Sequence, residues 1–291
     1  MKTLVIINPF SAGGKALESR AEIESSLAAL DIDYKIHISE NLKDMTNTVK
    51  NYLSSDFENF IAAGGDGTIH YIANALIGSS KKMGAIPLGS GNDAATNLGI
   101  SSNIADCCKI IKNGKTKSID MGIINDKYYY LCIAGSGFDS EVSDLANNTK
   151  FPIKGPSKYK YAVYKTLLTF RSKEFTFSYH GQERKMQGML VVASNMSSYG
   201  GGMKITPDAD PCDGLFDICI IKRMSKPHFI KVFPKVFEGK HIDDPSVEIF
   251  RTSELELNSK HAFSVFADGE YICKLPAKFK VVPGILDFLV P

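Results

Sequence analysis

Ala63-Gly64-Gly65-Asp66-Gly67-Thr68 is the stretch that decides the fold of this chain. The apolar run 60–62 in front of it is typical of a buried strand, and residues 69–76 behind it repeat apolar side chains at helical spacing. The glycines therefore lie at a strand-to-helix turn, where a ligand can approach the main chain without meeting a Cβ. Because the helix that follows presents unpaired N–H groups and a positive dipole end, the turn suits a phosphate group.

Asp66 is an acid in a turn that otherwise favours anions. The simplest reason for it is a metal ion, or a metal-bound water, between the carboxylate and the phosphates. The alternative is a tight turn in which Asp66 or Thr68 caps the helix without any ligand. A glycine-rich turn alone does not decide between these two hypotheses, because its meaning depends on the rest of the chain.

The composition of the 291 residues is that of an ordinary globular protein, with enough length for two domains. The formal net charge of +2 gives no argument for nucleic acid as a partner. The six cysteines have no C-x-x-C spacing, which indicates reduced thiols in a cytoplasm. The N-terminus has no signal-peptide pattern, and the apolar runs are too short to span a bilayer. We therefore expect a cytoplasmic protein that meets the inner membrane only at its surface.

The first 120 residues alternate between strand and helix patterns, which predicts a parallel sheet with helices on both faces. Ligands of such sheets bind at the carboxyl ends of the strands. Three turns of small residues fall at those ends, so we expect them to cluster around a nucleotide phosphate; they are residues 8–14, 64–68 and 89–93. The strands expected here are 3–7, 34–38 and 60–63, with helices at about 15–30 and 44–53.

From about residue 123 onward, short strands separated by turn residues predict an antiparallel, sandwich-like second domain. The predicted strands are 128–134, 175–180, 188–193, 216–221, 247–250, 255–258, 263–266 and 279–282, with helices at 159–170 and 226–237. The apolar run 285–289 is expected to return to the first domain. The domains are then residues 1–122, to which 284–291 return, and residues 123–283.

Residues 206–215 form a loop stiffened by two prolines and rich in acids. Asp210 and Asp213 are three residues apart, close enough to share one hard cation, and the carbonyl of Leu215 is a plausible third ligand. The alternative is a solvated acidic loop made of Asx-turns. We expect the metal loop.

A third candidate stretch is Ala267-Asp268-Gly269-Glu270, which follows a predicted strand. If the chain stays extended, the side chains of Asp268 and Glu270 face the same way. A carboxylate near a substrate hydroxyl can act as the base in phosphoryl transfer. The alternative, which the pattern alone favours, is a D-G hairpin turn.

The segment from Lys150 to Lys173 carries lysines, an arginine and aromatic residues but no acid. Basic and aromatic residues on one helix suit an anionic membrane surface. The alternative is a helix with one core face and one solvated basic face. The sequence leaves oligomeric state open, a homodimer included.

Five motifs of this chain, taken together, resemble one family. In chain order they are Gly64-Gly65-Asp66-Gly67-Thr68, Gly89-Ser90-Gly91-Asn92-Asp93, Gly137-Phe138-Asp139, Pro207-Asp208-Ala209 with Asp213-Gly214, and Asp268-Gly269-Glu270. This order is similar to that of diacylglycerol-kinase-type lipid kinases, the bacterial lipid kinases among them, and the resemblance spans almost the whole chain. The first motif alone is shared with NAD kinases and phosphofructokinases, so their α/β fold is expected for the first domain.

The resemblance implies an ATP-dependent kinase that phosphorylates a lipid hydroxyl at a membrane surface, with diacylglycerol as the default substrate and Mg²⁺ as cofactor. It implies that Asp210, Asp213 and the Leu215 carbonyl hold a structural magnesium ion. It implies that Glu270 is the proton acceptor, with Asp268 as a rival. The nucleotide contacts that it implies are Asn8, Pro9, Phe10, Ser11, Ala12, Ser39, Gly64, Gly65, Asp66, Gly67, Thr68 and Ser90.

The chain departs from the family pattern in two places. After the first motif the family usually has Asn-Glu, where this chain has His70-Tyr71, and after Asn92-Asp93 the run is Ala94-Ala95-Thr96. The first departure motivates a different hypothesis, a non-catalytic regulator that binds nucleotide or lipid without turnover. A third hypothesis, an NAD kinase, is supported by the central turn alone.

Overall fold

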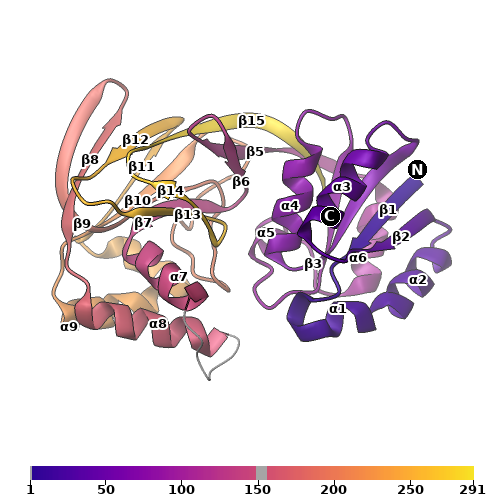
Figure 1. Ribbon diagram of the computed structural model, residues 1–291, viewed down its shortest axis with the longest axis horizontal. Helices are drawn as coiled ribbons and strands as arrows, with labels where there is room; N and C mark the ends of the chain where they lie inside the picture. The colour runs from indigo at the N-terminus through magenta and orange to yellow at the C-terminus, as the bar shows by residue number, and fades with distance from the viewer. Residues whose placement is uncertain (1, 149–155) are drawn as a thin grey trace. The chain divides into compact units, whose positions relative to one another are not determined.

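The computed structural model describes residues 2–148 and 156–291, and their side chains except for those of 147–148 and 156–160. The chain divides into two compact units (Figure 1). The first consists of residues 1–120 and 283–291, and the second of residues 121–282. The last strand, β15 (Ala277–Leu289), therefore begins in the second unit and ends in the first.

The first unit is built on a parallel sheet. Its strands lie in the order β2-β1-β3-β4, and the end of β15 pairs in parallel with β4. Residues 4–7 of the central strand are fully buried, as expected for a strand whose two faces are both covered. The predicted parallel α/β fold is confirmed. The strands are β1 (Lys2–Ile7), β2 (Asp33–Ile38), β3 (Phe57–Gly64) and β4 (Lys82–Pro87).

Helices cover both faces of this sheet. Helix α2 (Arg20–Ala29) packs against α6 (Ile104–Asn113), and α3 (Leu42–Tyr52) packs against α4 (Asp66–Leu76) on the other face (Figure 1). This arrangement follows from right-handed crossovers, because the chain moves to one edge of the sheet after β1 and back across it after β2. The short helix α5 (Asp93–Asn97) follows β4.

The single helix expected from 15 to 30 is wrong in detail. Residues Ser11–Gly14 form a 3₁₀ turn, and α1 (Lys15–Glu18) is separated from α2 at Ser19. Ala12 and Gly13 have φ values of 49° and 71°, in the left-handed region that a continuous helix cannot include. The small residues of this stretch therefore make a turn before the helix.

The second unit is antiparallel. The order is β14-β13-β7-β9-β8-β12-β15, with β10 between β9 and β11. Its core is rich in fully buried aromatic side chains, among them Tyr130, Phe175 and Phe216. Strand β5 (Thr116–Ile124) begins in the first unit and ends in the second. The other strands of the second unit are β6 (Tyr128–Tyr130), β7 (Ile133–Gly137), β8 (Lys173–Tyr179), β9 (Gln182–Ser194), β10 (Phe216–Lys222), β11 (Val247–Thr252), β12 (Glu254–Asn258), β13 (Ser264–Ala267) and β14 (Glu270–Lys274).

The helices of this unit depart most from the sequence-based expectation. Helices α8 (Pro156–Thr169) and α9 (Lys226–Val232), the latter followed by a 3₁₀ turn (Phe233–Glu238), correspond to the two predicted helices. Helix α7 (Phe138–Asn148) was not predicted. It is rich in Ser, Asp and Asn, which have low helix propensity, and its buried stripe consists of Phe138, Val142 and Ala146. The predicted strand 128–134 is two strands, β6 and β7.

The structure bears on two expectations, the state of the cysteines and the length of the apolar helices. All six cysteines, which lie in the described ranges, are free thiols. Among the helices that are described, none has the length and hydropathy needed to cross a bilayer.

Candidate functional site

Three turns of the first unit meet at the carboxyl ends of β1, β3 and β4. The Asn8 side-chain amide, after β1, donates a hydrogen bond to Thr68 Oγ1 over 3.0 Å. The Gly65 amide, after β3, donates to Ser11 Oγ over 3.3 Å. These bonds join the turn at 8–14 to the turn at 64–68. The expected meeting of these two turns is confirmed.

The third turn joins them through the backbone of two glycines. A Cβ built on Gly89 would lie 2.4 Å from the Cα of Gly65, far closer than two carbon atoms can approach. Gly65 itself has an ordinary φ of −96°. A glycine is therefore required at Gly89 because the two turns touch, and the fit at Gly65, where an added Cβ would lie 3.1 Å from the Gly89 Cα, is also tight. The approach of a ligand to this turn stays a prediction. At Gly67 an added Cβ would meet nothing within 4 Å, so this position is open at the start of α4.

Asp66 connects the second turn to the third. Its Oδ1 accepts a hydrogen bond from the Ala94 amide, in the first turn of α5, over 3.0 Å. The carboxylate thus satisfies a donor at the start of the neighbouring helix, a role close to the capping alternative. This bond explains an acid in the turn without a metal ion.

The N-terminus of α4 is the feature that these turns enclose. Its N-cap is Gly65, which has no side chain to accept from the first-turn amides. An uncapped N-terminus of an eleven-residue helix offers donors and a positive dipole end to an anion. Phe10, Gly67 and Ser90 are exposed around it, as a ligand-contacting rim requires.

Ser39 is placed differently from the other predicted nucleotide contacts. It is buried, and both its amide and its hydroxyl donate to the Ile7 carbonyl, over 2.9 and 3.1 Å. The side chain therefore fastens the end of β2 to β1. A nucleotide contact by Ser39 stays a prediction.

The two acids of the 267–270 stretch lie at a hairpin. Asp268 and Gly269 have φ values of 47° and 87° and connect β13 directly to β14. These angles are those of a two-residue turn of the primed type, so the D-G hairpin is confirmed. The extended chain that would point Asp268 and Glu270 the same way is wrong.

The carboxylate of Asp268 is occupied by backbone amides. Its Oδ2 accepts from Leu131 over 2.7 Å, and its Oδ1 accepts from Cys132 and Ile133 over 2.9 and 3.2 Å. Asp268 thereby orders the segment that leads into β7. Glu270, in contrast, is exposed at the first position of β14.

The acidic loop before β10 contains two Asx-turns. Asp210 Oδ1 accepts from the Cys212 amide over 3.1 Å, and Asp213 Oδ1 accepts from the Leu215 amide over 3.0 Å. Among the described residues there is no group of three or more His, Cys, Asp or Glu side chains that could hold a metal ion. The predicted set of two carboxylates and a carbonyl is made of hard oxygen donors, which fits a cation that keeps several waters, as Mg²⁺ does.

Two residues beside this loop were missed by the sequence analysis. Arg251 Nε donates to Asp217 Oδ1 over 3.1 Å, and the two residues face each other across the β10–β11 pair. Burial raises the pKa of Asp217, and the hydrogen bond from Arg251 opposes that rise. No local signal could have found the pair, because the residues are 34 positions apart and only strand register brings them together.

Asp139, at the start of α7, carries a shifted carboxyl group. Burial raises its pKa from 3.8 to about 6, and a hydrogen bond from Tyr199 limits that rise. Shifted carboxyls of this kind occur more often at functional sites than elsewhere. The motif that contains Asp139 was recognised in the sequence, but its environment was not.

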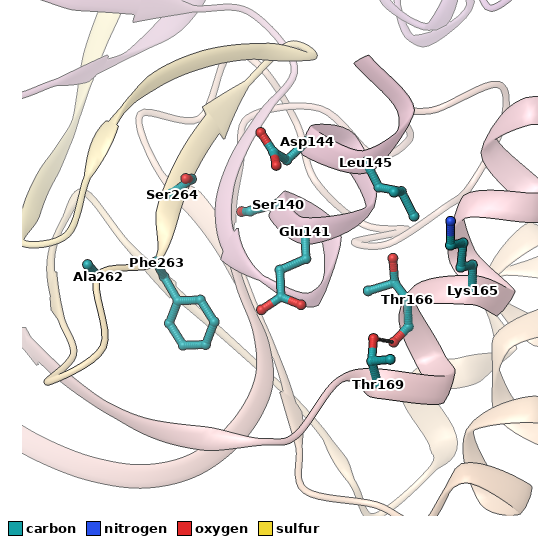
Figure 2. A pocket seen from close by; sticks show the side chains of 10 residues that line it. All are labelled: Ser140, Glu141, Asp144, Leu145, Lys165, Thr166, Thr169, Ala262, Phe263 and Ser264. Atoms are coloured by element: carbon teal, nitrogen blue, oxygen red, sulfur yellow. Dashed lines mark hydrogen bonds between the residues drawn. The ribbon is translucent and has the colours of Figure 1, made fainter. Parts of the chain in front are cut away.

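A pocket of about 440 Å³ lies in the second unit (Figure 2). Figure 2 shows Glu141 of α7 between Phe263 on one side and Thr166 and Thr169 of α8 on the other. Its lining mixes hydroxyl, charged and apolar side chains. The residues that line it are Ser140, Glu141, Asp144, Leu145, Lys165, Thr166, Thr169, Ala262, Phe263 and Ser264.

Comparison with known families matches almost the whole chain in two parts. The model described as the diacylglycerol kinase catalytic domain matches residues 2–124. The model described as the YegS C-terminal NAD kinase beta sandwich-like domain matches residues 132–290, more than half of the chain.

Individual proteins agree with these matches. A diacylglycerol kinase of Mycobacterium tuberculosis is 30% identical over 100% of this chain and 95% of its own length. One of Bacillus subtilis is 29% identical over 94% of this chain and 91% of its own length. A crystal structure of a diacylglycerol kinase from Bacillus anthracis has a TM-score of 0.77 at 21% identity, covering 100% of this chain and 97% of that one, which shows the same fold.

The contact between the second and third turns predicts unequal effects of two glycine substitutions. Gly89→Ala should lower the free energy of unfolding by about 1–3 kcal/mol, because the new Cβ overlaps the Gly65 backbone. Gly67→Ala is the matched control in the same site: its Cβ enters open space, and alanine in a helix is favoured by about 0.5–1 kcal/mol. Urea unfolding of the two variants checks this, and equal stability would refute the packing argument.

The environment of Asp139 predicts a pH-dependent difference between wild type and Asp139→Asn. Because the folded pKa is raised from 3.8 to about 6, the folded state binds the proton more tightly, so wild-type stability falls as pH rises through this window. Relative to wild type, Asp139→Asn should gain up to about 3 kcal/mol between pH 4 and 6, with no further gain above. Urea unfolding at pH 4, 5, 6 and 7.5 measures the difference. A constant difference across these values would contradict the prediction.

Proposed function

The chain belongs to the diacylglycerol kinase family of lipid kinases, and from this premise we propose that it transfers the γ-phosphoryl group of ATP to the free hydroxyl of diacylglycerol, giving phosphatidic acid. The family places the chain with lipid kinases, whereas the NAD kinase hypothesis rested on the central turn alone. The relatives named diacylglycerol kinase support the proposed substrate.

The meeting of three turns at the uncapped N-terminus of α4 is the observation that carries the proposal. Phosphoryl transfer needs little covalent help from the protein, but it needs the phosphates held and their charge balanced. We assign the nucleotide to this edge of the sheet. The contacts proposed are Asn8, Pro9, Phe10, Ser11, Ala12, Gly64, Gly65, Asp66, Gly67, Thr68 and Ser90, with Ser39 as an outlying member.

Glu270 is proposed as the proton acceptor. It would take the proton of the lipid hydroxyl as that oxygen bonds to the γ-phosphorus and the bond to the departing ADP breaks. Asp268 is less suited to this role because three backbone amides already bind its carboxylate. Its proposed role is to hold the hairpin that carries Glu270.

Magnesium is proposed at the loop of Asp210, Asp213 and the Leu215 carbonyl. Both residues reach solvent, and each Oδ1 is held in place by a loop amide, so the orientation of the carboxylates is fixed before a cation arrives. When bound there, Mg²⁺ would supply a fixed positive charge that keeps the acidic loop together.

The departure at His70-Tyr71 does not remove the contacts between the turns. His70 is only 9% exposed, and its carbonyl accepts from the Asn74 side chain over 2.9 Å. The bonds that join the turns come from other residues of the site, Asn8 and Ser11 among them. We therefore favour an active kinase over a regulator without turnover.

A surface of α8 and α9 is proposed to dock on anionic membranes. On α8, Tyr161, Tyr164 and Leu168 are exposed, Leu168 by 71%, and on α9 Ile230 is 51% exposed. The Lys226 ammonium, at the start of α9, donates to the Leu168 carbonyl near the end of α8, which brings these two helix ends together. Apolar tips among lysines suit the interface of an acidic bilayer. Of the predicted basic segment, Lys150 and Lys154 lie outside the described residues.

The pocket between α7 and α8 is proposed for the lipid acceptor. Its hydroxyl and carboxylate groups can bind polar parts of a lipid alcohol, while Phe263 and Leu145 can contact its carbon chain. Because α8 contributes both to this pocket and to the proposed membrane surface, a lipid could enter from the bilayer.

Turnover tests the proposal directly. With labelled ATP, Mg²⁺ and a panel of lipid alcohols, the chain should phosphorylate diacylglycerol. Glu270→Gln should lower kcat by about 10²–10⁴-fold with nucleotide affinity unchanged, because only the proton acceptor is lost. Glu254→Gln, another exposed carboxylate of the same unit, is the control and should retain activity. Phosphorylation of NAD without any lipid product, or full activity of Glu270→Gln, would overturn the assignment.

Vesicle sedimentation tests the membrane surface separately. Leu168→Asn should weaken binding to neutral and anionic vesicles alike, because it removes apolar insertion. Lys165→Gln should weaken binding to anionic vesicles only, by about fivefold, since each lysine near an acidic surface contributes about 1 kcal/mol. Lys185→Gln, in the β8–β9 hairpin, is the control and should bind as wild type. Equal loss on both vesicle types for Lys165→Gln would contradict the electrostatic part.

A further inference from the structure

One guanidinium group closes the acidic loop that precedes β10. Arg251 Nη2 donates to the Asp208 carbonyl over 2.9 Å, and its Nε donates to Asp217 Oδ1 over 3.1 Å. Its Nη1 lies 3.8 Å from Asp213 Oδ2. The same side chain therefore contacts the beginning of the loop, the middle of the loop, and the start of strand β10 that follows it.

The anchor of this arrangement is Asp217. It is only 3% exposed, on β10, directly opposite Arg251 of β11. A carboxylate buried to this degree requires a charged partner, because an unpaired one would lose its hydration without compensation. Among the described residues its Oδ2 has no hydrogen-bond partner, so the contact with Arg251 through Oδ1 is what compensates the charge. The position of Arg251 is thus fixed from the core side.

We propose that Arg251 is a positioning residue for the divalent cation of this loop, holding Asp210 and Asp213 in the arrangement that binds it. This inference rests on the proposed magnesium site. Arg251 does not ligate the cation: it acts through the loop, whose first carbonyl and middle carboxylate it fixes relative to β10.

The contact to Asp213 leaves that carboxylate available to a cation. At 3.8 Å, Nη1 is too far from Oδ2 for a hydrogen bond, so the guanidinium attracts the oxygen without using its lone pairs. The other oxygen, Oδ1, is held by the Leu215 amide. Asp213 is therefore oriented at one oxygen and attracted at the other, as a preorganised ligand should be.

The planar fork of arginine is essential to this role. Three nitrogen atoms of one rigid group contact three separate parts of the loop and strand, and a lysine ammonium on a flexible stem cannot reproduce their spacing. Arg251→Lys keeps the positive charge but should therefore still weaken the binding of a divalent cation by the loop.

Binding of Mn²⁺, followed by electron paramagnetic resonance of the full chain without nucleotide or lipid, tests the proposal. Arg251→Lys should lower Mn²⁺ affinity by about 10- to 100-fold, the usual effect of losing a residue that supports a metal ligand. Arg184→Lys is the matched control, because Arg184 of β9 pairs with Glu248 at 2.7 Å, and Glu248 lies near the opposite end of β11 from Arg251. It should bind Mn²⁺ as wild type does.

A second variant tests whether misfolding, rather than loss of positioning, causes the weaker Mn²⁺ binding. Asp217→Asn keeps the shape of the anchor and removes its charge, so it should also weaken Mn²⁺ binding, and the double variant should be no weaker than either single one. In turnover assays the apparent KM for free Mg²⁺ should rise while the KM for lipid stays the same.

The possible results distinguish the positioning role of Arg251 from the proposed magnesium site on which it rests. Wild-type Mn²⁺ affinity in folded Arg251→Lys and Asp217→Asn would overturn the positioning role alone. If Asp213→Asn binds Mn²⁺ as tightly as wild type, the proposed metal site fails and the inference falls with it. Loss of binding in Arg184→Lys as well would also overturn it, since the effect would then be general to the sheet.

Discussion

The first unit depends on the contact between two backbones, Gly65 after β3 and Gly89 after β4. A side chain at Gly89 would overlap the neighbouring turn, with its Cβ 2.4 Å from a Cα. With the turns in contact, the Asp66 carboxylate reaches the Ala94 amide, and the turn after β1 bonds to the turn after β3. The uncapped end of α4 thus lies among three fixed turns. Such rigidity is what electrostatic catalysis of phosphoryl transfer requires, because donors that are already in place need no reorganisation.

The second unit positions Glu270, the proposed proton acceptor, in a different way. Its chemistry-bearing stretch is a two-residue hairpin turn, and the turn residue Asp268 binds three consecutive amides before β7. A hairpin tip would otherwise be among the more mobile parts of a sheet. By bonding to a segment more than a hundred residues away in sequence, Asp268 fixes the start of β14, where Glu270 lies exposed.

The sequence predicts this fold well where the pattern is local. The buried run of β1, the glycine turn before α4 and the alternation of strand and helix all carry short-range signals, and the parallel sheet and the meeting of its turns follow from them. It fails where tertiary contacts override propensity. Helix α7 is a poor helix by composition and forms because Phe138, Val142 and Ala146 enter the core. The Asp217–Arg251 pair and the raised pKa of Asp139 depend on strand register and packing, which no single sequence displays.

The acids of the family motifs divide into two kinds once their contacts are known. Four of these acids accept hydrogen bonds from backbone amides, namely Asp66, Asp210, Asp213 and Asp268. They therefore stabilise turns, in addition to any role in binding or catalysis. Backbone amides that bond to a carboxylate fix its position and occupy part of its capacity to accept further hydrogen bonds. Proton transfer is proposed instead for Glu270, which lies exposed at the first position of β14. The same reasoning explains why a motif can be recognised without revealing which of its acids performs the chemistry: the residue type is shared, and only the hydrogen-bond partners distinguish the roles.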